Sequence, residues 1–324
     1  MPSKRKFEEQ LAALEALREA PEESRIDPLR KGLANKNNFV AAKASNLVRT
    51  FHLTQLTPEL LAAFDRFFEN AEKTDPQCWA KNAISRALAA FEHQDADVFL
   101  RGMKHIQMEP VWGGSSDTAG TLRATCALAL VQCRSLREHD LLTYLIDLLF
   151  DKEKTVRIEV VRAIEMVHSP TAALLLRERA VLGADEPEVL GACYGGVLRI
   201  EGAKAIPWVS RFMAPGDDAA AEAALALAAT HSDAGFQALK DRLTTALDPW
   251  FRSVLLSAIA LTRQDAAIEF LLDLVAKDSR DAEGALEAVV RAMPSDDIMQ
   301  RLEKLVSGNV RLKRQLALLR KPSR

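Results

Sequence analysis

The chain has 324 residues, of which 48% are hydrophobic and 27% are charged, and its formal net charge is −2. This balance excludes a protein wholly committed to the phosphate backbone of a nucleic acid, because such a protein needs a concentrated basic face. No apolar run approaches the roughly 20 residues that span a bilayer, and the amino-terminal segment lacks a signal-peptide core, so we expect a cytoplasmic protein without a membrane span.

Residues 1–25 predict a helix that caps the amino-terminal end of the fold. Charged residues alternate there with Leu11, Leu14 and Leu17, a spacing that places the three leucines on one helical face. The basic triplet at residues 4–6 is expected to be the solvated start of this helix.

Residues 26–310 predict helices almost throughout. Apolar residues recur at three- and four-residue spacings, and runs that alternate strictly at every second residue are missing. Several breaks end in a capping residue followed by proline, a pair that favours the first turn of a helix. These pairs are Thr57-Pro58, Asp75-Pro76, Ser169-Pro170 and Asp248-Pro249. We therefore expect an all-α protein.

A recurring apolar stripe divides this segment into units. The clearest copy is Val156, Val160 and Ala163, and the same i, i+4, i+7 pattern begins at residues 122, 156, 189, 221, 251 and 282. Two looser copies begin near Val40 and Ala80. Because a second apolar helix follows each stripe, the sequence predicts eight helical pairs that share one continuous core.

These units resemble HEAT repeats, particularly the short bacterial kind also found in phycobilisome lyase subunits. The resemblance rests on an acidic residue before the first helix, a Leu122-Arg123 or Val156-Arg157 pair that opens it, and an alanine that closes its stripe. It covers about residues 26–309, with longer units at 40–120 and no opening arginine at 187–230. The resemblance implies an armadillo-type, right-handed α-α superhelix of about eight hairpins that holds other macromolecules, with second helices on its concave side.

No residue pattern in the sequence predicts catalysis, a cofactor or a metal site. The four cysteines form no CxxC or CxxxC pair, and the six histidines form no i, i+3 or i, i+4 pair. The deoxyhypusine hydroxylases, which resemble this architecture, need His-Glu dyads that are missing here. A ladder of aspartates precedes the first helices, where we interpret them as helix caps. Its members are Asp117, Asp151, Asp185, Asp217, Asp248 and Asp278.

The glycine-serine segment at residues 109–121 is the longest interruption. It fails the phosphate-loop pattern and the nucleophile-elbow pattern, so we interpret it as an enlarged connection between two units. Its Trp112 either covers the end of a helix or projects as an aromatic anchor for a partner.

The carboxyl-terminal segment 311–324 carries six basic residues and no acidic one. Its Leu312, Leu316 and Leu319 predict a last helix that covers the exposed core of the final unit. The alternative is a basic helix that contacts an acidic partner, a nucleic acid or a membrane surface.

The resemblance and the missing catalytic motifs together predict a non-catalytic scaffold that binds a protein or peptide. The expected contact residues are Arg66, Lys104, Arg177, Arg211, Lys240 and Asp273 on second helices, together with Trp112. A less favoured alternative is nucleic-acid binding or repair, because alkylpurine DNA glycosylases resemble this architecture, although no shared motif connects the four tryptophans. A third hypothesis, a bilin lyase or chaperone, rests on the resemblance alone.

Overall fold

The computed structural model describes residues 2–320, and the side chains of residues 7–320. The described chain is mostly helical, as the apolar periodicity predicts. It divides into two compact units, residues 1–167 and residues 168–324, and this division falls inside the segment 26–310. Each unit is described by itself below.

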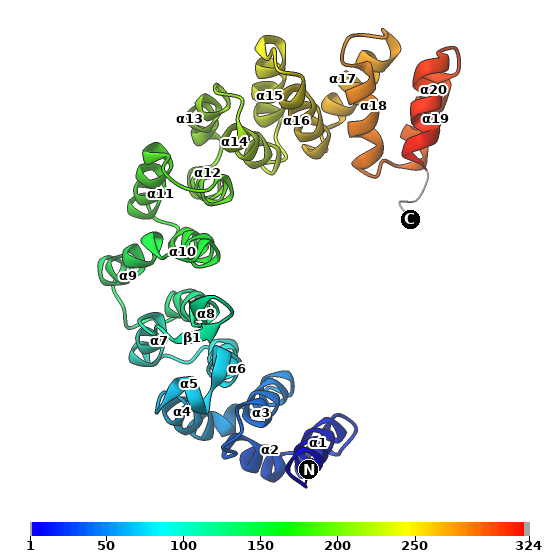
Figure 1. Cartoon of the computed structure of the whole chain (residues 1–324). Coiled ribbons are helices and arrows are strands. Elements are labelled where there is room, and N and C mark those ends of the chain that lie inside the picture. The colour runs from blue at the N-terminus through cyan, green and yellow to red at the C-terminus, as the bar shows by residue number, and fades with distance from the viewer. Residues whose placement is uncertain (1, 321–324) are drawn as a thin grey trace. The chain divides into compact units, whose positions relative to one another are not determined.

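The amino-terminal unit consists of short helices interrupted by one β-hairpin (Figure 1). Its elements are α1 (Pro2–Glu15), α2 (Ile26–Leu33), α3 (Asn38–Thr50), α4 (Thr57–Arg66), α5 (Ala71–Thr74), α6 (Trp79–Ala90), α7 (Ala96–Met103), β1 (Met108–Val111), β2 (Gly114–Asp117), α8 (Gly120–Leu130), α9 (Glu138–Ile146) and α10 (Lys154–Val167). We call α3, α6, α8 and α10 the stripe row of this unit, and α2, α4, α7 and α9 its second row.

The carboxyl-terminal unit repeats the same arrangement. Its elements are α11 (Pro170–Leu182), α12 (Pro187–Glu201), α13 (Ile206–Ser210), α14 (Asp218–Ala228), α15 (Asp233–Thr245), α16 (Pro249–Leu261), α17 (Asp265–Ala276), α18 (Ala282–Arg291), α19 (Asp296–Val306) and α20 (Val310–Leu319). Here α12, α14, α16 and α18 form the stripe row, and α11, α13, α15 and α17 form the second row (Figure 1).

The helices pack as pairs of sequence neighbours, but in a different order from the predicted one. Among helices adjacent in sequence, the more extensive contacts join a second-row helix to the stripe helix that follows it, as in α2 with α3, α7 with α8, and α11 with α12. From the sequence, we expected each stripe helix to pair with the helix that follows it. Apolar spacing gives the buried face of each helix but carries no information on which neighbour covers that face.

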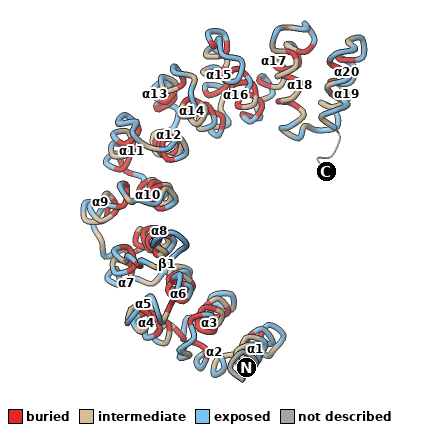
Figure 2. Tube along the Cα trace, in the orientation of Figure 1, coloured by how far each residue is buried: buried red, intermediate tan, exposed pale blue. Residues whose placement is uncertain are grey.

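The predicted stripe is buried in α8, α10, α12, α16 and α18, and Figure 2 shows buried positions along these helices. In α14 the expected stripe of Ala221, Leu225 and Ala228 is shifted by one residue. Leu225 is 39% exposed, whereas Leu227 is fully buried together with Ala224. The reason is composition, since seven of the eleven residues of α14 are alanine and apolar spacing therefore fits more than one face; Asp218 and Glu222 lie on the same face as Leu225.

Buried cations at the start of stripe helices join neighbouring elements. The Arg123 guanidinium donates to Asp117 at 2.6 Å and to Asp151, just before α10, at 2.7 Å. Lys81 at the start of α6 pairs with Asp75 at 3.0 Å, and neither side chain is exposed. Arg252 of α16 donates to Asp281, just before α18, at 2.8 Å. In α8 and α16, the arginine that follows the first stripe residue therefore binds the segment just before the next stripe helix.

The aspartates of the ladder have two roles in the structure: some cap helices and others form ion pairs. Asp217 and Asp248 accept backbone hydrogen bonds from Ala220 and Phe251, so these two are helix caps as predicted. Asp278 does not cap α18; it has a positive φ and pairs with Arg311 at 2.5 Å. The helix begins later, at Ala282.

Both ends of the described chain are covered by helices. At the amino-terminal end, Leu14 and Leu17 are buried and α1 packs on α2 and α3. At the other end, α20 packs on α18 and α19 and buries Leu312 and Leu316. Residues 321–324 of the predicted basic segment lie outside the described residues.

Replacing Arg123 with methionine should lower the free energy of unfolding by about 3 to 5 kcal/mol, because Asp117 and Asp151 would keep their buried charges without a cation. Urea denaturation monitored by circular dichroism measures this change. Arg134→Met is the matched control, since its side chain is 85% exposed and its loss should change stability very little. Equal effects of the two substitutions would contradict the role assigned to Arg123.

Candidate functional site

The glycine-serine segment, which we interpreted as an enlarged connection between two repeat units, lies between α7 and α8 and folds as a β-hairpin. Strand β1 pairs antiparallel with β2, with Met108 opposite Asp117 and Val111 opposite Gly114. The turn between them is Trp112-Gly113, in which Gly113 has a φ of +87°, a region that glycine adopts without steric cost. Sequence periodicity could not detect strands of four residues that contain a proline and two serines.

A carboxylate holds the base of the hairpin from inside. The Asp117 Oδ1 atom accepts hydrogen bonds from the backbone N–H groups of Gln107 and Ala119, each at 3.0 Å. Its Oδ2 atom accepts from Arg123. Burial opposes ionisation of Asp117, but these donors outweigh it and hold the pKa of the carboxyl below its ordinary value.

A second carboxylate joins the hairpin to the turn before α6. The Glu109 Oε1 atom accepts from the backbone N–H of Gln77 at 2.6 Å and from the hydroxyl of Thr118 at 2.9 Å. It also accepts from the Nε2 atom of Gln107, which in turn donates to the carbonyl of Asp75 at 2.9 Å. Because these bonds link three segments of the chain, β1 has a defined position on the surface of the unit.

The anchored hairpin exposes apolar side chains. The Trp112 side chain is 103% exposed, so it makes no use of its large apolar surface within the chain. This exposure rules out the first interpretation, in which the indole covers the end of a helix. Ile106 is 67% exposed, and Met108 and Val111 are each about half exposed. Exposed apolar side chains on one short segment make this hairpin a candidate interaction site.

An aromatic row continues this surface next to the hairpin. The Phe39 and Trp79 rings lie 5.3 Å apart between centroids, and Phe7 packs against Phe39 at 6.3 Å. The Trp79 indole donates to Gln77, the residue whose backbone is bound by Glu109. The aromatic row is therefore adjacent to β1.

The sequence analysis missed the aromatic row, although a signal was present. Phe39 and Trp79 directly precede Val40 and Ala80, where the two looser copies of the stripe begin. They are therefore at equivalent positions of two sequence repeats, in the first turns of α3 and α6. Both side chains are almost half exposed.

A pocket of about 250 Å³ lies at the base of the hairpin, between residues 70–73 and residues 105–107. His105 borders it, with its Nε2 atom 3.0 Å from the Oε1 atom of Gln107, and burial lowers the pKa of this imidazole. Behind Gln107, burial raises the pKa of the Cys78 thiol to about 11. Cys78 is therefore a protonated, buried thiol at neutral pH and no nucleophile.

The predicted contact residues on second helices are mostly engaged within their own unit. Arg66 donates to the carbonyl of Leu33 at 2.6 Å at the end of α2. Asp273 pairs with Lys277 at 2.7 Å along α17. Lys104 is exposed and lies at the carboxyl-terminal end of α7. Arg66 and Asp273 are therefore engaged in contacts within their own units.

The other three predicted cations lie over aromatic rings. The guanidinium carbons of Arg177 and Arg211 lie 4.3 Å and 5.1 Å from the Trp208 ring, and Arg177 also pairs with Glu201. The Lys240 Nζ atom lies 5.0 Å from the Phe270 ring.

Three further structural findings concern residues 2–320. Within that range no group of three or more histidine, cysteine, aspartate or glutamate side chains is arranged to hold a metal ion. No helix in the same range combines the length and apolar character that crossing a membrane requires. All four cysteines are buried and free of disulfide bonds.

Comparison with known proteins assigns no relative. The sequence matches none of the known protein-family models, and it has no match among curated proteins.

The stability of the hairpin base should depend on pH through Asp117. Its pKa is lower in the folded chain than in the unfolded chain, so its contribution is complete above about pH 4 and is lost as the pH falls through the folded value. Urea unfolding between about pH 6 and about pH 3 should show a steeper loss of stability for the wild type than for Asp117→Asn. Parallel curves for the two proteins would contradict this prediction.

Proposed function

We propose that the protein is a non-catalytic interaction scaffold that binds a partner protein through the hairpin surface of its amino-terminal unit. This surface consists of Ile106, Met108, Val111 and Trp112 together with the adjacent aromatic row. The observation that carries the proposal is the fully exposed Trp112 indole on a hairpin whose base is fastened by hydrogen bonds from Asp117 and Glu109 to the backbone.

Its architecture is, in this proposal, a right-handed α-α superhelix of HEAT-like hairpins. The paired packing of sequence neighbours in two rows supports it, as do the buried stripes and the cations that follow them. Successive stripe helices contact one another more extensively than successive second-row helices do. Closer packing on one side bends a stack toward that side, which favours stripe helices over second helices as the lining of a concave face.

The exposed tryptophan suits a protein partner for an energetic reason. An indole offers a large apolar area and one hydrogen-bond donor, and tryptophan is enriched among residues that dominate binding energy at interfaces. A rigid support adds to this, because a side chain that is already positioned loses less conformational freedom on binding. The Glu109 and Asp117 hydrogen bonds provide that support.

Trp112→Ala should weaken capture of a partner protein by about 2 kcal/mol or more, while the fold stays unchanged because the indole contacts little of its own chain. Quantitative affinity capture followed by titration of the purified partner measures the loss. Leu247→Ala is the matched control, since Leu247 is 86% exposed in the other unit. A partner that binds Trp112→Ala as tightly as wild type would refute the hairpin surface as the binding site.

Nucleic-acid binding has weaker support. Arg49 and Arg86 are exposed on stripe helices of the amino-terminal unit, which favours it. In the carboxyl-terminal unit, however, the exposed residues of the stripe helices include the acidic Glu188 and Asp218. The bilin-lyase hypothesis gains no support from the contacts described.

We expect no binding of a fluorescent DNA duplex or single strand at low salt, where phosphate contacts are strongest. Fluorescence anisotropy measures this directly. Binding that falls steeply with added salt, and that disappears in an Arg49→Ser, Arg86→Ser double variant, would instead favour the nucleic-acid function.

A further inference from the structure

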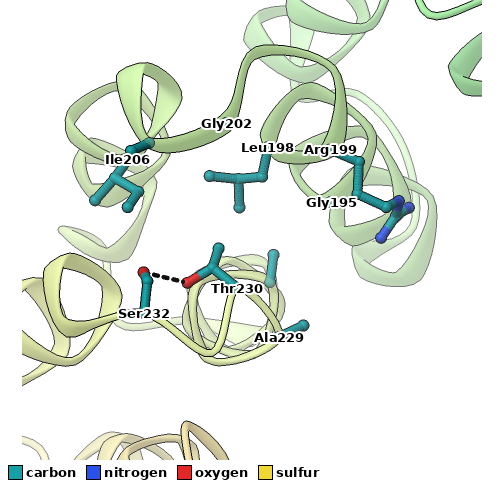
Figure 3. Close-up of a pocket in the computed structure, with 10 residues that line it drawn as sticks. Gly195, Leu198, Arg199, Gly202, Ile206, Ala229, Thr230 and Ser232 are labelled. Atoms are coloured by element: carbon teal, nitrogen blue, oxygen red, sulfur yellow. Dashed lines mark hydrogen bonds between the residues drawn. The ribbon is translucent and has the colours of Figure 1, made fainter. Parts of the chain in front are cut away.

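The pocket of about 300 Å³ that α12 and α14 border has its hydroxyl groups satisfied within the chain (Figure 3). Thr230 donates to the carbonyl of Leu227 at 2.7 Å, and the Thr230 and Ser232 oxygen atoms lie 2.8 Å apart. Ser232 also accepts from the backbone N–H of Gly235 at 3.1 Å. The hairpin of the amino-terminal unit differs from this pocket, because one of its strands has backbone groups that point away from the chain.

The register of the hairpin determines which backbone groups these are. Thr118 donates to the carbonyl of Gln107 at 2.9 Å, and this bond continues the pairing in which Met108 lies opposite Asp117. In an antiparallel pair, hydrogen-bonded positions alternate with positions whose N–H and C=O groups both point outward. Counted from this bond, Ser115 and Asp117 are the outward positions of β2.

The outer edge of β1 is closed to a further strand. The residue opposite Ser115 is Pro110, which is also at an outward position and has no N–H to donate. The same strand is tied to the turn before α6, where the Glu109 side chain accepts from the backbone N–H of Gln77. A strand can therefore be added to this hairpin only beside β2.

The outer edge of β2 is open. The sheet consists of β1 and β2 alone among residues 2–320, and in the same range the N–H groups of Ser115 and Asp117 donate to no other segment. Ser115 and Ser116 are exposed, and a Cβ atom added to Gly114 would meet nothing within 4 Å beyond its chain neighbours. β2 has no lysine or proline, the residues that commonly protect an exposed edge, and its one carboxylate is bound to Arg123.

The free groups of β2 fit an extended chain. The N–H and C=O groups of Ser115 and Asp117 repeat at about 7 Å along one edge, and a chain in β conformation presents complementary groups at that spacing. β2 itself has no apolar side chain. Two copies of β2 would therefore bury little apolar area against each other, so the occupant has to bring apolar side chains of its own.

Gly114 determines where the largest of these side chains lies. It is paired with Val111, so both residues are on one face of the hairpin, and Val111 is half exposed. An aromatic side chain on a neighbouring strand covers the bare backbone of an edge glycine. Trp112 directly follows Val111 in the turn, so this aromatic residue is at the same end of the hairpin as the exposed indole.

We propose that β2 binds an extended segment of the partner protein, which joins the hairpin as a third strand. The segment forms backbone hydrogen bonds with Ser115 and Asp117 and places an aromatic residue beside Gly114. This inference rests on the hairpin surface as the binding site and adds the conformation and chemistry of the bound segment. Trp112 supplies apolar contact area, and β2 sets the register of the segment.

Ser115→Pro and Ser115→Thr are the matched variants. Proline removes the outward N–H and places a ring at the edge, but it leaves the ladder with β1 intact, because that ladder does not use the Ser115 N–H. Threonine keeps the N–H and favours a strand. The probes are linear peptides selected from a random phage-displayed library on the full-length protein, and calorimetric titration of the synthetic peptides measures their affinity.

The selected peptides should have apolar residues at alternate positions, one of them aromatic. Ser115→Pro should weaken their binding at least about tenfold, whereas Ser115→Thr should bind them as wild type does. N-methylation of alternate peptide residues should weaken binding for one set of positions and not for the other, because only one set of N–H groups faces β2.

Amide hydrogen exchange provides an independent measurement. Bound peptide should protect the N–H groups of Ser115 and Asp117 in the wild type. The Thr118 N–H, which the hairpin itself uses, should stay equally protected in both variants and so show that each keeps its hairpin.

Three results would overturn the proposal. The first is the absence of any peptide that prefers the wild type to Ser115→Pro, and the second is peptide affinity that N-methylation does not change at either set of positions. The third is a dimer in analytical ultracentrifugation that Ser115→Pro dissociates, which would assign the edge to a second copy of the chain.

This proposal and the proposed function fail in different ways. A captured partner that Trp112→Ala releases but Ser115→Pro still binds would keep the hairpin surface as the binding site and remove the added strand. A partner that is indifferent to Trp112→Ala would instead refute the binding surface itself.

Discussion

The cation at the start of a stripe helix is the interaction on which the packing of these helices depends. Lys81, Arg123 and Arg252 are all removed from water, and a buried charge is tolerated only with a partner. For Arg123 and Arg252 a partner comes from just before the next stripe helix, Asp151 and Asp281. Each pair adds little net stability compared with an apolar contact of the same size. Its effect is to specify which helix lies next and in which position.

The second row is connected by a different type of contact, in which several of the predicted contact residues take part. Arg177 and Lys240 are long side chains whose stems pack on apolar surface and whose charged ends lie over rings of the following second-row helix. Such contacts keep the charge partly solvated, so they cost less than the buried pairs of the stripe row. A mixed-charge surface can thus result from packing alone.

The hairpin has a hydrogen-bonded base and an exposed apolar turn. A two-stranded hairpin is marginal in water, so its position has to come from contacts at its base. Glu109, Asp117 and Gln107 provide these contacts, and Arg123 connects them to the ion pairs of the stripe row. The indole of Trp112 can therefore remain exposed without loss of order at the base.

The sequence by itself determined the helical class, the buried stripe of most stripe helices, the closing helices at both ends and two of the aspartate caps, because these follow from local spacing along one chain segment. Only the tertiary structure decided the rest. The pairing order of helices, the register of α14, the hairpin, and the juxtaposition of Phe39, Trp79 and Gln77 with β1 all depend on contacts between segments far apart in sequence. Spacing predicts which face of a helix is buried, but the neighbour that buries it is chosen by long-range packing and by the need to pair buried charges.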